Sequence, residues 1–406
     1  MAEACCSTNM NYLIKGGEFN NKGAEAMTLV ALYNIKKRDP SARIYILCEG
    51  PKCPFELIND PVFLKVSPYF LDVEFGDNSI STKKKILKDY IKLFVPTKIS
   101  YVGNRAHTLK IINSIDVVID ISGFALSSKW GEAIADNYIK WIDLLKANGA
   151  KIYLMPQSFG PFHFDQELMR KIKSSLEKCD HIFAREEQGY QDLAEIGLTN
   201  VTKSLDSVLV DKEYDPSYVI RDFDSYREDY PVRSKHNVGI VPNARLFDRG
   251  NASREKLISL YSDIINCHIN DNYSYFLISH AGEDLGICGE IKSKFLHHRN
   301  VVLFDHVLYS FNFEQFAGKL DYIVASRYHS IVHAYRSGTP CAIIGWSDKY
   351  DEIAKAFGQE RYIINTDSLC LDNIIALDDN YKRESTRIME RLQTAQKSSC
   401  YSIILH

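Results

Sequence analysis

Residues 322–345 read YIVASRYHSIVHAYRSGTPCAIIG. The stretch begins with four apolar residues, passes through the polar turn at 326–330 and continues with a segment of helical period. Gly338-Thr339-Pro340 ends that segment, and a second apolar run starts at Cys341. A strand, a helix and a strand in this order are typical of a βαβ unit, whose two strands are parallel. The stretch therefore predicts a parallel sheet covered by helices.

The same alternation of short apolar runs and helix-period segments extends over most of the chain. The runs are nearly continuous in Val, Ile and Leu, which indicates strands buried on both faces of a sheet. We expect strands in two sets, 12–14, 43–47, 116–121, 151–155 and 181–184, then 237–241, 274–278, 301–304, 322–325 and 341–345. The expected fold class is α/β, with two Rossmann-like domains whose parallel sheets face a cleft.

The boundary between these domains is predicted from composition. Residues 216–235 are dense in Asp, Arg, Tyr, Ser and Pro and lack a clear period, as linkers often do. The expected units are an N-terminal domain at 1–215, the linker at 216–235, a C-terminal domain at 236–378, and a helix and tail at 379–406.

Composition narrows the class of protein and its compartment. The 406 residues carry a net charge of −3, so no global field favours nucleic acid. The ten cysteines form no CxxC pair, which argues against a zinc ribbon and a disulfide scaffold and favours reduced thiols in the cytoplasm. The start shows no signal-peptide pattern, and no apolar run approaches the ~20 residues that span a bilayer.

One basic stretch bears on membranes. Six lysines between residues 83 and 98 alternate with Ile and Leu. They predict either an ordinary surface helix or a weak peripheral contact with anionic lipid at the inner face of the membrane.

Polar residues at the ends of the expected strands are the candidate site, because ligands of parallel α/β sheets bind there. The first turn, 16–26, reads GGEFNNKGAEA and contains Asn21, Gly23 and Glu25. Its glycines permit close approach of a ligand, and the following helix offers N–H groups to an anion. Two alternatives remain open for this turn. It could be required only for packing, or it could bind NAD with Glu49 contacting the ribose, although its glycine spacing is not that of the GxGxxG motif.

Two further turns of the first domain suit neutral ligands. The strand 116–121 contains Asp120 and ends at Ser122-Gly123, and the strand 151–155 is followed by Gln157 and Ser158. Such side chains suit sugar hydroxyls or phosphate oxygens. Asp120, an acid inside a buried strand, could ligate or hydrogen-bond, and it could equally belong to a network that fixes strand ends.

Cationic residues follow other strands. Arg185 follows strand 181–184 and either binds an anion or pairs with Glu186 or Glu187. Arg327, Tyr328 and His329 stand at a helix N-terminus, where the helix dipole already favours anions.

The spacing of His329 and His333 on one helical face raises the question of zinc. A third ligand is not evident and Ser330 stands where the HExxH motif has its glutamate, so we expect no metal. Two more strand ends add His280, with Asp284 after it, and Trp346 with Lys349. Lys349 is either a phosphate ligand or an exposed lysine, and Trp346 either stacks on a sugar or belongs to the core.

In order along the chain, these turns resemble the polysaccharide pyruvyl transferase family. The resemblance runs from Gly17 to about Gly358 and departs from the family pattern at Phe124, Ser207 and Tyr328. The matching positions are Asn21 to Ala26, Ser122-Gly123, Gln157 to Phe162, Arg185-Glu186, Asp206, His280 with Asp284, Arg327 to His329, Gly338 to Pro340, and Lys349.

The resemblance implies a glycosyltransferase-B-like architecture and a transferase that moves the pyruvyl group of phosphoenolpyruvate onto a sugar of a bacterial surface polysaccharide or its precursor. It implies that Arg185, Arg327 and His329 contact phosphoenolpyruvate, and we expect these three to be catalytic. Tyr328, His280 and Lys349 complete the expected donor set, without a cofactor.

With this activity, we expect the first domain to lie on the acceptor side and the second to bind the donor anion. The expected acceptor set is Asn21, Gly23, Glu25, Ser122, Gly123, Gln157 and Ser158. Glu25 or Asp120 could take the proton of the sugar hydroxyl, and the acceptor's lipid linkage stays open. The alternatives are a nucleotide-sugar glycosyltransferase of the same architecture and a non-catalytic sugar-binding protein.

Overall fold

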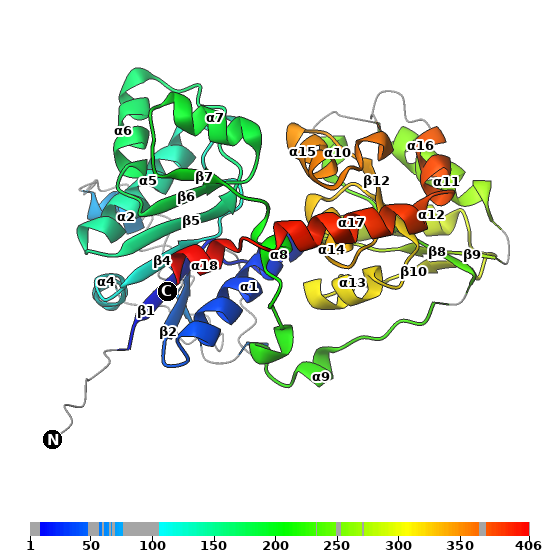
Figure 1. Cartoon of the computed structure of the whole chain (residues 1–406), viewed down its shortest axis with the longest axis horizontal. Helices are drawn as coiled ribbons and strands as arrows, with labels where there is room; N and C mark the ends of the chain where they lie inside the picture. Colours follow the sequence, from blue (N-terminus) through cyan, green and yellow to red (C-terminus); the bar gives the residue numbers. More distant parts are fainter. Residues whose placement is uncertain are drawn as a thin grey trace.

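The computed structural model describes residues 9–47, 57–58, 61–64, 66, 70–75, 105–232, 234–248, 253–269, 272–364 and 371–405. The lysine-rich stretch at 83–98 and Glu49 lie outside these residues. The described chain forms two α/β domains side by side, each a parallel sheet covered by helices (Figure 1). The fold class expected from the sequence is therefore confirmed.

The first sheet has seven strands within the described residues, in the order β3-β2-β1-β4-β5-β6-β7. All neighbouring strands are parallel, and the order reverses between β1 and β4. The strands are β1 Asn11–Lys15, β2 Arg43–Leu47, β3 Val62–Leu64, β4 Val117–Asp120, β5 Lys151–Gln157, β6 His181–Ala184 and β7 Val201–Lys203.

The second sheet repeats this plan with six described strands, in the order β10-β9-β8-β11-β12-β13. Its order reverses between β8 and β11, again with parallel pairing. The strands are β8 His236–Val241, β9 Tyr273–Leu277, β10 Val301–Leu303, β11 Tyr322–Ala325, β12 Cys341–Ile344 and β13 Ile363–Ile364.

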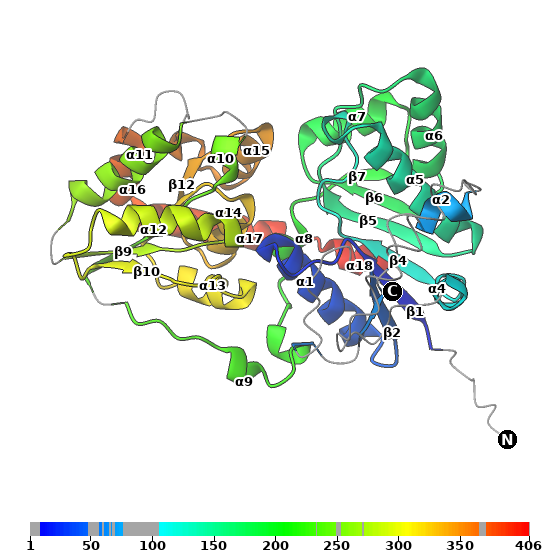
Figure 2. The same cartoon turned by 180° about the vertical axis from the view of Figure 1, so that it is seen from behind.

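Helices cover both faces of each sheet, as the apolar strands require (Figures 1 and 2). The first domain contains α1 Lys22–Arg38, α2 Phe70–Glu74, α4 Arg105–Ile112, α5 Glu132–Ala147, α6 Gln166–Leu176, α7 Glu187–Glu195 and α8 Ser207–Val210. The second contains α10 Arg245–Asp248, α11 Arg254–Cys267, α12 Leu285–Ser293, α13 Ser310–Ala317, α14 Tyr328–Arg336, α15 Asp348–Phe357 and α16 Asp372–Asp378.

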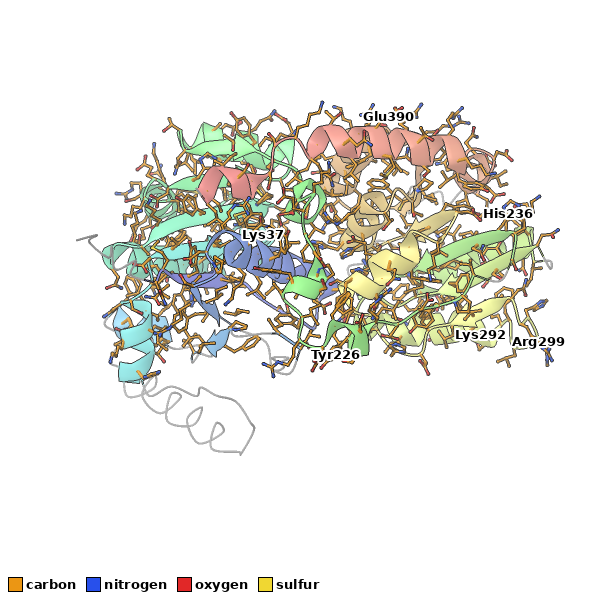
Figure 3. All side chains as sticks on the ribbon, turned by 60° about the horizontal axis from the view of Figure 1, so that its bottom comes forward. Lys37, Tyr226, His236, Lys292, Arg299 and Glu390 are labelled. Carbon is orange, nitrogen blue, oxygen red and sulfur yellow. The ribbon has the colours of Figure 1, made fainter. Side chains whose placement is uncertain are left out.

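The domains are joined twice. The segment between β7 and β8 contains a 3₁₀ turn at Pro216–Tyr218 and the short helix α9 Phe223–Tyr226. Beyond α16, α17 Tyr381–Ala395 packs on the second domain and α18 Cys400–Ile404 returns to β5 of the first (Figure 1). In α17, Ile388 and Leu392 are buried, whereas Glu390 lies on the outward face (Figure 3). Among the described helices, none is both long and apolar enough to cross a membrane.

A buried carboxylate connects the two domains at the start of α1. Glu25 is fully buried and accepts hydrogen bonds from the backbone N–H and the hydroxyl of Ser310, at 2.7 and 2.8 Å. Ser310 begins α13 of the second domain, so the charge of Glu25 also lies at a helix N-terminus. Its other oxygen pairs with Lys22 at 2.5 Å. One side chain therefore satisfies a buried ammonium and caps a helix of the other domain.

We expect Glu25→Gln to destabilise the protein by about 3–5 kcal/mol, because the buried Lys22 ammonium loses its counter-charge. The matched control is Glu167→Gln, which removes the charge of an exposed pair with Lys171. This control should leave the free energy of unfolding nearly unchanged. Urea unfolding measures both variants, and equal effects would show that Glu25 does not hold the domains together.

Candidate active site

A cavity of about 290 Å³ lies between the two domains. Gly16 follows β1 and Ser122 follows β4, the two strands between which the first sheet reverses. Asn243 and Arg327 follow β8 and β11, where the second sheet reverses. Open α/β sheets bind ligands at this position, and here the two positions face one another.

Arg185, which lies directly after β6, is buried and contacts protein groups through all three of its nitrogens. Its Nε contacts Glu186 at 2.8 Å, its Nη1 contacts Asp206 at 3.0 Å, and its Nη2 donates to the hydroxyl of Ser158 at 2.8 Å. Its guanidinium lies 4.5 Å from the centre of the Tyr328 ring. Burial lowers the pKa of Arg185, but Glu186 and the other anionic neighbours raise it by more. The net change is upward, so the guanidinium stays charged. Arg185 therefore forms the ion pair with Glu186 that was one of its two expected roles, and it also lines the cavity.

His329, in the first turn of α14, is surrounded by the first domain. Its Nε2 lies 3.5 Å from the carboxylate of Asp206, the same oxygen that pairs with Arg185. Its Nδ1 faces Gly23, where an added Cβ would lie only 2.1 Å away. Burial lowers the pKa of His329, while the Asp206 carboxylate opposes the change. The pKa of Asp206 is lowered in turn, because His329 and Arg185 outweigh the effect of burial.

Arg327, the N-cap residue of α14, pairs with both oxygens of Asp284. Its Nε and Nη2 contact them at 2.9 and 2.6 Å, and Nη2 also reaches Glu283 at 3.0 Å. Asp284 is fixed in addition by the backbone N–H of Ala244, at 2.9 Å. The guanidinium is therefore held in one orientation at the cavity wall.

Most of the residues expected from the sequence meet at this cavity. It is lined by Asn21, Ser122, Gly123, Arg185, His280, Arg327, Tyr328, His329, Trp346 and Lys349. The Lys349 ammonium lies 5.4 Å from the centre of the Tyr328 ring and 5.1 Å from that of Trp346. Strand ends far apart in the sequence thus form one surface.

Four expected acceptor residues are not among the lining residues. Gly23 packs against His329, and Glu25 is used at the domain junction. Gln157 is fully buried and donates to the Tyr138 hydroxyl at 3.2 Å. Ser158 holds Arg185. The side chains of Glu25, Gln157 and Ser158 are already hydrogen-bonded to protein groups, so these residues contribute to the structure around the cavity rather than to its lining.

Several lining residues were not singled out from the sequence. Asn243 and Arg245 follow β8, and Glu18 belongs to the first turn. The strand-end rule that identified Arg185 applies to the turn after β8 equally well. Trp130 and Tyr350, which no sequence pattern indicated, add aromatic surface together with Phe124.

The HxxxH pair of α14 is divided between two environments. His329 faces Asp206, whereas His333 contacts Glu314 at 3.0 Å. In the part of the chain that the structure describes, no group of three or more His, Cys, Asp or Glu residues is arranged to hold a metal ion.

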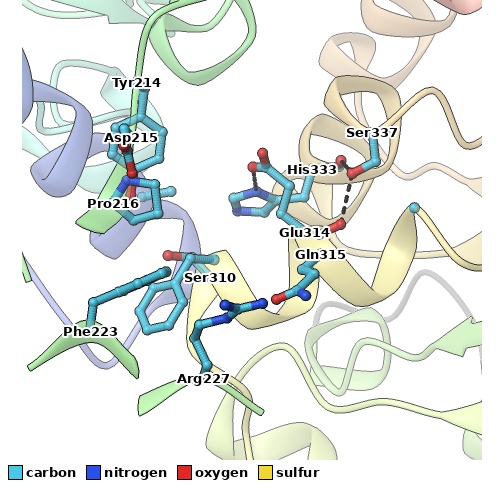
Figure 4. A pocket seen from close by; sticks show the side chains of 13 residues that line it. Tyr214, Asp215, Pro216, Phe223, Arg227, Ser310, Glu314, Gln315, His333 and Ser337 are labelled. Carbon is cyan, nitrogen blue, oxygen red and sulfur yellow. Dashed lines mark hydrogen bonds and ion pairs between the residues drawn. The ribbon is translucent and has the colours of Figure 1, made fainter. Parts of the chain in front are cut away.

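His333 faces a second cavity, of about 440 Å³, between α13, α14 and the interdomain segment (Figure 4). Arg227 lines it together with Asp215 and Glu314, so positive charge does not accumulate there. The interdomain cavity of about 290 Å³ is therefore the better anion site, and it is called the anion site below.

The fold and the cavity together define a two-domain α/β protein of glycosyltransferase-B architecture with a cationic interdomain site. Solved structures support the architecture, each at an identity that shows the fold alone. A mutant of S. aureus TarM in complex with fondaparinux, α-GlcNAc-glycerol and UDP is 10% identical, with a TM-score of 0.54 and 98% of each chain covered. The S. aureus MnaA–UDP co-structure is 12% identical with a TM-score of 0.53, covering 97% of this chain and 92% of MnaA.

The chain belongs to the polysaccharide pyruvyl transferase family, whose model matches residues 21–348. The matched range includes every cavity residue named above from Asn21 to Trp346. Membership makes the protein a transferase and implies a sugar acceptor. No curated protein sequence matches the chain.

We expect Gly23→Ala to cost about 1–3 kcal/mol of stability, because the new methyl group would overlap the His329 ring. Gly289→Ala is the matched control, since a Cβ there meets no atom within 4 Å in helix α12. The control should stabilise by about 0.4–1 kcal/mol. Thermal unfolding of the two variants should therefore shift in opposite directions, and a neutral Gly23→Ala would contradict the close contact.

The buried histidines predict pH-dependent stability. Burial lowers the pKa of His280 well below its ordinary value of 6.5, and His333, His329, Arg327 and Lys22 lower it further. The unfolded chain therefore binds more protons below pH 6.5, so the free energy of unfolding should fall as pH decreases from 7.5 to 5. His280→Gln should flatten this dependence in urea titrations, and an unchanged slope would exclude His280 as a source.

Proposed function

We propose that the protein transfers the pyruvyl group of phosphoenolpyruvate to a sugar of a bacterial surface polysaccharide or its precursor, forming a pyruvate ketal. The observation that carries this proposal is the convergence of Arg185, Arg327 and His329, from both domains, on one cavity. Phosphoenolpyruvate combines a carboxylate with a phosphate, and guanidinium groups match both.

The two arginines can bind an anion although each is ion-paired. A guanidinium has five N–H donors. Arg185 uses one from each nitrogen for Glu186, Asp206 and Ser158, which leaves one on Nη1 and one on Nη2. Arg327 contacts Asp284 and Glu283 through Nε and Nη2, which leaves Nη1 for a ligand. The protein partners thus fix the guanidinium planes without using every donor.

The size of the cavity supports a small donor. Its volume of about 290 Å³ is at the lower limit of the ~300–1,000 Å³ found for drug-sized ligands. Phosphoenolpyruvate suits this volume better than a nucleotide sugar. UDP-glucose is therefore a useful comparison ligand. It is bound in a structure of Anabaena HepE, which is 11% identical to this chain with a TM-score of 0.50, covering 98% of this chain and 97% of HepE.

His329 is proposed as the general acid. Burial lowers the pKa of His329, which favours the neutral imidazole when the site holds no anion. A bound trianion favours the protonated form, so the proton arrives together with the donor. His329 then protonates the methylene carbon C3, and the first sugar hydroxyl bonds to C2.

Ketal formation then completes the proton balance. The C2–O bond to phosphate breaks, and the second hydroxyl of the same sugar bonds to C2. Of the two hydroxyl protons, one replaces the proton that His329 gave to C3 and the other leaves on phosphate. Closure within one sugar avoids the entropic cost of a further encounter.

The test compares phosphate release and ligand binding by the full-length chain. His329→Asn should lower turnover at least ~100-fold, as loss of general acid catalysis does, while phosphoenolpyruvate still raises the melting temperature. His306→Asn, at a half-exposed histidine outside the cavity, is the matched control and should keep wild-type turnover.

Arg327→Lys should weaken phosphoenolpyruvate binding by about 2–4 kcal/mol, because lysine cannot bind Asp284 and the donor together.

Stabilisation of the wild type by UDP-glucose and not by phosphoenolpyruvate would instead support the nucleotide-sugar alternative. Normal turnover of His329→Asn would remove the histidine from the mechanism.

A further inference from the structure

A smaller cavity of about 190 Å³ adjoins the anion site and lies within the first domain. Gly16, Glu18 and Ser122 line both cavities, so the two spaces meet at the ends of β1 and β4. The rest of its wall comes mainly from α5, through Ile134, Asn137 and Tyr138. None of these three α5 residues lines the anion site.

The polar side of this cavity is built on a buried ion pair. Lys15, only 4% exposed, contacts Asp120 at 3.2 Å and donates to the Ser122 hydroxyl at 3.2 Å. Its ammonium also lies 4.4 Å from the centre of the Tyr138 ring. Because Asp120 balances the charge of Lys15, this wall offers hydrogen bonds without net positive charge.

The charge of the two cavities is therefore divided. Arginines, a lysine and His329 surround the anion site. The smaller cavity is lined by the neutralised Lys15, the Asn137 amide and the Glu18 carboxylate, and also by the apolar Ala125 and Ile134. Hydroxyl-binding groups combined with apolar surface suit an uncharged sugar ring, and the small volume limits the ligand to one ring.

Glu18 occupies the border between the cavities. Its carboxylate makes no hydrogen bond or ion pair with any residue that the structure describes, unlike Glu25 and Asp120. Glu18 is partly exposed and lines both spaces. Glu25 and Asp120, the acids expected from the sequence to take the hydroxyl proton, are both engaged, whereas Glu18 is unengaged and lines both cavities.

We propose that the smaller cavity binds the acceptor as one uncharged sugar ring and that Glu18 is the general base. Glu18 takes the proton of the first hydroxyl as its oxygen bonds to C2 of the donor. The π electrons of the donor meanwhile accept the proton of His329 at C3. Glu18 then passes its proton on, directly or through water, to restore His329. This inference rests on the proposed function.

The experiment measures phosphate release by the full-length chain with phosphoenolpyruvate and methyl glycosides of galactose, glucose and mannose. Glu18→Gln should lower kcat at least ~100-fold, with unchanged phosphoenolpyruvate binding and melting temperature. Glu18→Asp, which keeps the carboxylate, should retain more turnover than Glu18→Gln. Glu132→Gln, at an exposed position in α5 outside both cavities, is the matched control.

The sugar cavity is tested separately through Asn137. Asn137→Ala should raise the acceptor KM roughly two- to tenfold, the effect of one lost hydrogen bond, and leave donor affinity unchanged. Asn148→Ala, at the other end of α5, should keep the wild-type KM.

Wild-type kinetics in both Glu18→Gln and Asn137→Ala would overturn this inference and leave the proposed function in place. Absence of phosphate release by the wild type with every glycoside would overturn the proposed function, and this inference with it.

Discussion

The environment of one imidazole determines how the two domains must meet. His329 belongs to α14 of the second domain, yet its two nitrogens face Asp206 and Gly23 of the first. The contact with Gly23 leaves no room for a side chain, so the start of α1 and the start of α14 lie in direct contact. The cavity around His329 therefore exists only when the domains are docked, and the buried Glu25–Ser310 contact holds them in that arrangement.

Charge compensation explains how so many ionised groups remain buried. An isolated buried guanidinium would be very costly, but Arg185 and Arg327 each bind carboxylates that are themselves fixed. Asp206 accepts the backbone N–H of Val208, and Asp284 accepts that of Ala244. Such pairs contribute little net stability, since desolvation offsets their attraction. Their consequence is orientation, which an anion site requires before the ligand arrives.

The sequence predicted what depends on local pattern. Apolar runs identify buried strands, and the residue after each strand lies at the sheet edge, which brought Arg185 and Arg327 to the cavity. The sequence could not predict the use of Glu25, because its partner Ser310 is 285 positions away. Three short strands were not expected from the sequence, namely β3, β7 and β13, which have two or three residues each.

The two reversals of strand order also explain how one cleft can handle two unlike substrates. Each sheet opens its own crevice, and in the second domain the helix N-termini at Arg327 and at Lys349 bring cationic side chains to the cavity. The first domain neutralises its buried Lys15 with Asp120 before that charge reaches the adjoining cavity. An anion therefore meets excess positive charge on one side of the border at Glu18 and balanced charge on the other. Under the proposed function, this division directs the anionic donor and the uncharged acceptor to different cavities before either makes a specific contact.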